Sequence, residues 1–449
     1  MNDTIAAIST PLGEGAIALL RMSGSSAIAV VDEVFRARKR PSEMPPRVQH
    51  FGAIFAGDRK LDDVLVSVHR APASYTGEDV VEIGCHGGLL VTRRILELLL
   101  SKGARSAHPG EFTQRAFLNG KLDLTQAEAV MDLISAQTDL ALRAASEQLE
   151  GRLGERIREL REQFIGLLAH IEAYIDFPDE DIDPETGEAL LARLDAARAG
   201  IDALLATAGQ GKILREGLRT VICGAPNVGK SSLLNLLLGE ERAIVSATPG
   251  TTRDTIEEVI NLRGLPIKLI DTAGLRDTTD EIERAGIERT RQQLRRADLA
   301  LEVVDGSESR ESAQSDALAQ GELPSLHVLV LNKADLGEHA SWSGVEAVRI
   351  SCLKNEGLDQ LADAIMARIG GEAGAPRDWS LAINARHQAA LQQARDFATA
   401  AREALTSGLS PEFVAEELRA ALDGVGEVVG RVDTEEILGK IFSTFCIGK

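Results

Sequence analysis

The sequence predicts a multidomain α/β plus α protein in which a P-loop domain is inserted into a helical domain. Short β-like runs and Gly/Pro turns fill residues 1–118, which we predict to be an α+β domain. Apolar residues then recur at helical spacing over 119–212 and again over 376–449. Strand–loop–helix alternation occupies 213–375, and a length of 449 residues suits this number of domains.

The composition restricts the class of protein. A net charge of −20 argues against a protein that coats nucleic acid non-specifically. It does not exclude a nucleic-acid partner, because local arginine-rich faces can coexist with an acidic total. The chain has no run of about 18 apolar residues and no signal-peptide pattern at its start. Its four cysteines lack metal-ligand spacing, and they are Cys85, Cys223, Cys352 and Cys446. We therefore expect a cytoplasmic protein without disulfides or membrane contact.

Local patterns predict individual elements in the first half of the chain. Residues 89–103 read as a helix, and the expected strands before it are 16–24, 62–72 and 78–88. Thr125 and Glu128 match a capping box at the start of the central helical stretch. Its apolar positions are Leu149, Leu153, Ile157, Leu160, Phe164 and Leu167. A further helix is expected from about 186 to 208, on the same periodicity.

A phosphate-binding loop follows the first apolar strand of the α/β segment. Residues 224–232 read GAPNVGKSS, with the strand LRTVICG before them and the helix LLNLLLG after them. Gly224 and Gly229 allow the backbone to approach phosphates, so that amide donors point inward. Lys230 is expected to reach the β- and γ-phosphates, and the Ser231 hydroxyl to ligate Mg²⁺.

Three further motifs follow in the order of a GTPase. TPGTTRD (248–254) offers Thr252 as a second Mg²⁺ ligand, and Asp271 of DTAG can hold the metal through water. The Gly274 amide can sense the γ-phosphate. In NKAD, Asp335 can accept from the ring N–H and the amino group of guanine, which adenine cannot match. The four motifs together predict a GTP site.

The predicted GTP-binding residues are Asn227, Val228, Gly229, Lys230, Ser231, Ser232, Ser246, Ala247, Thr248, Pro249, Gly250, Thr251, Thr252, Asp271, Thr272, Ala273, Gly274, Asn332, Lys333, Asp335 and Ser351. Ser351 fits the loop that backs the base, whereas Cys352 and Leu353 depart from its usual Ser-Ala-Lys pattern. We assign Cys352 no chemistry beyond filling space beside the base.

Leu275 follows DTAG where many GTPases carry a glutamine that orients the attacking water. A leucine side chain cannot hydrogen-bond to water, so hydrolysis needs another group to orient the attacking water. Arg253 and Arg276 are close enough in sequence to serve as arginine fingers. A scaffold that binds GTP without hydrolysing it is another alternative.

Motifs outside the GTPase set are more specific. They are TGEDVVEIGCHGG, HPGEFTQRAFLNGKLDLTQAEAVMDLI, IDFPDEDI, LREG and FSTFCIGK. In collinear order over essentially the whole chain, they resemble the MnmE (TrmE) family of bacterial tRNA uridine-modification GTPases. The resemblance implies a homodimer through an N-terminal domain like the tetrahydrofolate-binding domains of one-carbon enzymes. It also implies a FAD-dependent partner, MnmG, with which a carboxymethylaminomethyl or aminomethyl group is placed on carbon 5 of the wobble uridine in tRNA.

The same resemblance implies residue roles. The one-carbon donor would be 5-formyl- or methylene-tetrahydrofolate, and the folate-binding positions are Arg21, Glu82, Lys121 and Lys449. Each of these alone would be an ordinary solvated charge. Cys446 is a possible functional cysteine in the same tail.

The resemblance also implies that a potassium ion, bound when two G domains meet, takes the place of an arginine finger. The implied K⁺ ligands are Asn227, Ser246, Thr248 and Thr251. Glu283 would place the attacking water, so the predicted catalytic residues are Glu283, Lys230 and Asn227. By spacing alone, Glu283 would be a helix-surface acid beside Arg284. A ribosome-assembly GTPase without modification activity remains the alternative function, and folate binding by the N-terminal domain distinguishes the two.

Overall fold

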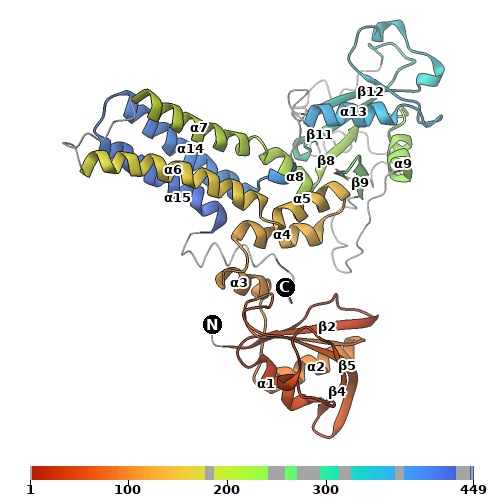
Figure 1. Cartoon of the computed structure of the whole chain (residues 1–449). Helices are drawn as coiled ribbons and strands as arrows, with labels where there is room; N and C mark the ends of the chain where they lie inside the picture. The colour runs from red at the N-terminus through yellow and green to blue at the C-terminus, as the bar shows by residue number, and fades with distance from the viewer. Residues whose placement is uncertain are drawn as a thin grey trace. The chain divides into compact units, whose positions relative to one another are not determined.

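The computed structural model describes residues 3–176, 187–240, 258–270, 294–312, 324, 326–369, 379–430, 445 and 448. The chain forms two compact units, each described here by itself (Figure 1). The N-terminal unit comprises Met1–Met131 and Gly426–Lys449, and the larger unit comprises Asp132–Val425. Among the described residues, no helix has the length and apolar character needed to cross a membrane.

A seven-stranded sheet in the order β3-β4-β5-β6-β2-β1-β7 forms the N-terminal unit. Its strands are β1 (Ile5–Ile8), β2 (Gly15–Ser23), β3 (Phe35–Arg36), β4 (His50–Ala56), β5 (Arg59–His69), β6 (Val80–Gly87) and β7 (Arg105–Ser106). Neighbours pair antiparallel except β1 with β7. The three strands and the helix expected from the sequence are therefore confirmed.

The two faces of this sheet differ in what covers them. Helices α1 (Ala27–Val34) and α2 (Leu89–Ser101) form one core with the buried face of the strands. Helix α3 (Glu111–Leu118) follows β7 in the chain. The opposite face carries Phe51 and Leu65 as register partners on β4 and β5, and these are 71% and 43% exposed. Ile17 on β2 is 75% exposed. This arrangement leaves large apolar side chains in solvent.

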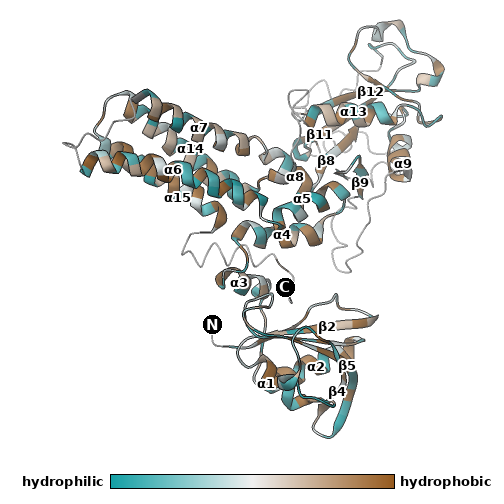
Figure 2. Cartoon of the chain, viewed as in Figure 1, coloured by the Kyte–Doolittle hydropathy of each residue, from teal (hydrophilic) through white to brown (hydrophobic). Residues whose placement is uncertain are grey.

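The helices before and after the α/β segment pack together, because α14 lies against α7. The helices are α4 (Leu124–Ser135), α5 (Asp139–Leu149), α6 (Arg152–Asp176), α7 (Gly187–Leu205), α8 (Ala208–Glu216), α14 (Ala385–Thr406) and α15 (Pro411–Val429). Both polar and apolar colours occur on α6 and α7 in Figure 2. The buried positions of α6 include all those expected from Leu153 to Leu167. This packing confirms the predicted insertion.

One local expectation was wrong. The capping box at the start of α4 is made by Asp123 and Gln126 rather than by Thr125 and Glu128. The Gln126 backbone N–H donates to Asp123 Oδ1 at 3.0 Å, and the Asp123 N–H donates to Gln126 Oε1 at 3.0 Å. The helix expected over about 186–208 is confirmed as α7 (Gly187–Leu205), and α8 begins separately at Ala208.

The α/β segment contains a six-stranded sheet in the order β13-β12-β11-β8-β10-β9. Its strands are β8 (Leu218–Cys223), β9 (Glu258–Leu262), β10 (Leu265–Leu269), β11 (Leu299–Asp305), β12 (Leu326–Asn332) and β13 (Val348–Arg349). All neighbours are parallel except β9 with β10. Helices α9 (Lys230–Glu240) and α13 (Leu358–Ile369) belong to the same segment. The four strands expected from the sequence are confirmed, and their carboxyl ends form the edge where α/β sheets bind ligands.

Candidate functional site

The phosphate-binding loop connects β8 to α9 and requires both of its glycines. Gly224 has φ +142° and Gly229 has φ +103°, conformations that disfavour any side chain. A Cβ at Gly224 would lie 2.1 Å from the Val303 carbonyl oxygen. A Cβ at Gly229 would lie 2.1 Å from Asn332 Nδ2. The loop is thus built to bring its backbone close to a ligand at the start of a helix, where amide donors and the helix dipole favour anions.

Lys230 supplies the cation of this loop from the first residue of α9. Its Nζ donates to the carbonyl oxygens of Gly224 and Ala225 at 3.0 and 2.6 Å. Burial lowers the pKa of the Lys230 ammonium, and the neighbouring Cys223 opposes that effect. Ser231 and Ser232 follow in the first turn of the helix. A desolvated ammonium beside a helix N-terminus suits a phosphate, whose charge replaces the lost hydration.

Asn332, at the end of β12, connects the phosphate loop to the loop predicted to back the base. Its Nδ2 donates to the Val228 carbonyl oxygen at 2.8 Å. Its Oδ1 accepts from the Cys352 backbone N–H at 3.2 Å. The Asn332 side chain is only 3% exposed, so both bonds are shielded from water. The two ends of the candidate nucleotide site are therefore held in one geometry by a single amide.

The base end of the site is held by short polar contacts. The Ser351 hydroxyl donates to Asp335 Oδ1 at 2.6 Å, which orients the carboxylate predicted to read guanine. Lys333 has φ +63°, and its Nζ donates to Asp305 Oδ2 at 2.6 Å. Burial would raise the pKa of Asp305, but bonds from Lys333 and Ser307 outweigh it and the pKa is lowered. These contacts place the Asp335 carboxylate and the Lys333 stem at one end of the sheet.

Asp305 was missed in the sequence, although its place at the end of a buried strand, LALEVVDG, was a usable signal. Burial raises the pKa of the Cys352 thiol to about 11. The thiol is therefore neutral at physiological pH, and Cys352 contributes its backbone N–H.

Several predicted site residues lie outside the described residues. They are Ser246, Ala247, Thr248, Pro249, Gly250, Thr251, Thr252, Asp271, Thr272, Ala273, Gly274, Glu283, Cys446 and Lys449, together with Arg253, Leu275 and Arg276. The described part of the candidate site comprises the phosphate loop and the base loops. Asn227, in the phosphate loop, is exposed with φ +65°.

Sequence comparisons with known proteins cover nearly the whole chain. Residues 4–121 match the family model of the GTP-binding protein TrmE N-terminus, and residues 124–446 match that of the MnmE helical domain. The tRNA modification GTPase MnmE of Akkermansia muciniphila is 51% identical over 450 residues, covering 99% of both chains. The chain belongs to the MnmE family of tRNA modification GTPases. The MnmE of Aquifex aeolicus is 46% identical over 455 residues, covering 100% of both chains.

A solved structure, the G domain of the T. maritima FeoB iron transporter, is 27% identical and matches with a TM-score of 0.25. The match covers 34% of this chain and 98% of that one. A score this low carries no argument about fold, so the family assignment rests on the sequence matches.

The N-terminal unit of this MnmE-family chain brings two predicted folate-binding residues together. Arg21 on β2 and Glu82 on β6 are register partners. The Arg21 Nε and Nη2 donate to Glu82 Oε1 at 3.0 and 2.7 Å. Glu82 Oε2 lies 3.8 Å from His69 Nε2. The Arg21 guanidinium carbon is 5.5 Å from the centre of the Tyr75 ring. A carboxylate with one oxygen directed away from its arginine, beside an aromatic ring, suits a flat ligand with N–H donors.

Lys121, the third predicted folate-binding residue, lies in the loop between α3 and α4. Its Nζ donates to the Pro72 carbonyl oxygen at 3.2 Å, so it contacts the 70–79 loop that carries Tyr75. The terminal tail also reaches this unit, because the Ser9 hydroxyl donates to the Gly448 carbonyl oxygen at 3.0 Å. Gly448 directly precedes Lys449 in the sequence.

A buried ion network fixes the 70–79 loop from α3. The Arg115 side chain is 1% exposed, and its Nη1 donates to Glu78 Oε2 at 3.0 Å while its Nη2 donates to Glu111 Oε1 at 3.0 Å. Arg105 Nη2 donates to the same Glu111 oxygen at 2.6 Å. Burial would raise the pKa of Glu111, but bonds from Arg105, the His108 N–H and Arg115 lower it. The network anchors the 70–79 loop, which carries Tyr75 beside Arg21 of the candidate folate pair.

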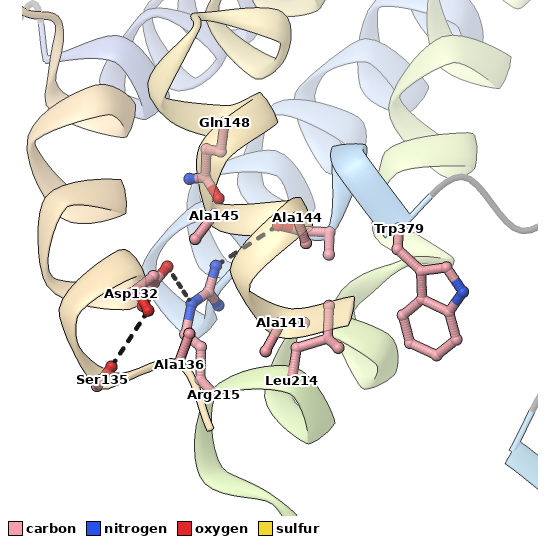
Figure 3. Close-up of a pocket in the computed structure, with 12 residues that line it drawn as sticks. Asp132, Ser135, Ala136, Ala141, Ala144, Ala145, Gln148, Leu214, Arg215 and Trp379 are labelled. Carbon is pink, nitrogen blue, oxygen red and sulfur yellow. Dashed lines mark hydrogen bonds and ion pairs between the residues drawn. The ribbon is translucent and has the colours of Figure 1, made fainter. Parts of the chain in front are cut away.

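Two family-like motifs, MDLI and LREG, meet in a small pocket of the larger unit (Figure 3). Arg215 Nε donates to Asp132 Oδ2 at 2.8 Å, and Arg215 Nη2 lies 3.5 Å from the Ala382 carbonyl oxygen. Leu214 lies beside Ala141 of α5 and belongs to the same core cluster as the β8 residues. Trp379 also lines this pocket. The junction ties α4, α5 and the 379–382 segment to the helix that leads into β8.

Proposed function

We propose that the chain hydrolyses GTP and, with a FAD-dependent partner of the MnmG type, modifies carbon 5 of the wobble uridine in tRNA. A carboxymethylaminomethyl or aminomethyl group is added, and a tetrahydrofolate derivative donates the one-carbon unit. The observation that carries the GTPase part is the Asn332 amide, which joins Val228 of the phosphate loop to Cys352 of the base loop. Family membership supports the tRNA part.

In this mechanism the protein mainly positions groups. The loop amides and Lys230 hold the β- and γ-phosphates, and Asp335 selects guanine with its carboxylate aimed by Ser351. Ser231 and Thr252 are the proposed Mg²⁺ ligands, and the metal would neutralise charge that develops on the phosphates. Glu283 is proposed to place the attacking water.

A potassium ion is the proposed substitute for an arginine finger. Asn227 supports this role, because it is an exposed residue of the phosphate loop with a left-handed backbone. The other proposed oxygen ligands are Ser246, Thr248 and Thr251. A monovalent cation there would offset the charge that grows between the β- and γ-phosphates, which is worth about 10³–10⁵ in rate for a finger.

The N-terminal unit is proposed to bind folate and to form a homodimer. Arg21 and Glu82, joined by two hydrogen bonds, support the folate site, with Lys121, Lys449 and Cys446 as further proposed contributors. The exposed Ile17, Phe51 and Leu65 support dimerisation, since a second copy would remove apolar surface from water.

Two measurements test this proposal. GTP turnover at equal ionic strength should be faster in K⁺ than in Na⁺, and Asn227→Ala should abolish the difference. Equal rates in the two salts would favour an arginine finger. Mass spectrometry of wobble uridine in tRNA from a deletion strain complemented with this gene should show the modification. Unmodified uridine with normal GTP turnover would favour the ribosome-assembly alternative.

A further inference from the structure

The loop that joins β3 to β4 is strongly basic in an acidic protein. Five basic residues and a single acid, Glu43, occur between positions 36 and 47. The basic residues are Arg36, Arg38, Lys39, Arg40 and Arg47. The whole chain has 49 basic and 69 acidic residues, so this basic loop opposes the overall charge.

The central cations of the basic loop are exposed and uncompensated. Arg38, Lys39 and Arg40 are all exposed, and they form no ion pair with the part of the chain that the structure describes. Glu43, the one acid of the loop, accepts a hydrogen bond at its Oε2 from the Arg40 backbone N–H at 3.2 Å. Arg36 stacks on Phe55 at 4.2 Å and lies 3.8 Å from the exposed Asp58. Three consecutive cations are therefore presented to solvent with their donors available.

Hydrogen bonds connect the basic loop to the 70–79 loop. Arg70 Nη2 donates to the Ser42 carbonyl oxygen at 2.7 Å. Arg47 Nη2 donates to the Ala73 carbonyl oxygen at 3.0 Å. The 70–79 loop thereby contacts the basic loop, and it also carries Tyr75 beside Arg21. All of these residues belong to the N-terminal unit.

We propose that the basic loop, residues 36–47, binds the phosphate backbone of the RNA substrate and holds it beside the candidate folate site. The proposal rests on the proposed function, which requires a uridine to reach a one-carbon donor. Guanidinium forks match phosphate oxygens in geometry, and adjacent cations release counterions when phosphates bind. An acidic protein could also use such cations, but RNA is favoured because the surface borders the candidate one-carbon site.

The test replaces Arg38, Lys39 and Arg40 by serine in the full chain and measures binding of a labelled tRNA transcript by fluorescence anisotropy. At low salt the affinity should fall at least about tenfold, and the slope of log K against log salt should become shallower by about 2–3, since each phosphate contact contributes about 0.9. A matched control replaces Arg158, Arg295 and Arg296, which are exposed cations of the larger unit. That control should bind tRNA as the unchanged chain does.

Each further outcome decides the question. Equal weakening in both triple variants would show a bulk charge effect and overturn the proposal. Unchanged tRNA affinity with loss of binding to the FAD-dependent partner would identify an acidic protein as the occupant, and would also overturn it. If the unchanged chain modifies wobble uridine while the loop variant binds and modifies tRNA normally, the inference fails but the proposed function stands. If the unchanged chain modifies no uridine, the proposed function itself fails.

Discussion

Replacing Gly229 by alanine tests the geometry of the nucleotide site directly. The new Cβ would lie 2.1 Å from Asn332 Nδ2, so the Asn332 side chain must move. That movement breaks its bonds to Val228 and Cys352, which contribute about 1 kcal/mol each. An alanine at φ +103° adds strain of about 1–3 kcal/mol. Partial relaxation of the loop would reduce this sum, so the nucleotide-binding conformation should be destabilised by about 2–4 kcal/mol. The Kd for nucleotide should therefore rise about 30- to 1,000-fold.

The assay is equilibrium binding of a fluorescent GDP analogue to the full chain, with circular dichroism to verify folding. Gly337→Ala is the matched control, because Gly337 has φ +93° but a Cβ added there would meet no atom within 4 Å. It should keep Kd within about threefold of the unchanged protein, which corresponds to under 1 kcal/mol. In an Asn332→Ala background, Gly229→Ala should cost only its strain. An unchanged Kd for Gly229→Ala, or the same loss in both backgrounds, would refute the reasoning.

Two other predictions concern buried charges. The folded-state pKa of Glu111 is lowered from 4.5, so its contribution to stability is complete above pH 4.5 and is lost as pH falls through the lower folded value. Glu111→Gln should lower the opening free energy that hydrogen exchange reports for α3 at pH 7, and should make that free energy less dependent on pH in the acid range. An unchanged acid profile of the opening free energy would contradict this. Asp132→Asn leaves Arg215 without a carboxylate partner. Amide hydrogen exchange of α8 should become about tenfold faster, equivalent to about 1–2 kcal/mol for a partly buried pair. Exchange at the unchanged rate would show that the pair is not structurally important.

The sequence was informative where local chemistry determines structure. The glycines and Lys230 of the phosphate loop could be predicted because a strand–loop–helix turn requires them. The capping box was misplaced because Asp123-Leu-Thr-Gln126 and Thr125-Gln-Ala-Glu128 overlap, and both fit one template. Only the residue at which the helix begins distinguishes them.

Contacts between residues distant in sequence could not be read in this way. Asn332 contacts Val228 across 104 positions, and that pairing depends on the order of strands in the sheet. Arg21 and Glu82 were identified only through the family resemblance, because the register of β2 with β6 brings them together. The two-residue strands β3, β7 and β13 carry no period that a sequence pattern could reveal.

Strand β8 connects the nucleotide site to the helical elements of the larger unit. Its carboxyl end leads into the phosphate loop, and its amino end follows α8, where Arg215 binds Asp132. Asp298 secures that amino end by accepting from the Arg219 N–H at 3.1 Å and from Lys212 Nζ at 2.9 Å. Six residues of extended strand span about 20 Å. Strand β8 is bonded on both sides, to β11 and β10, so the phosphate loop and the Arg215 junction lie at the two ends of one central strand.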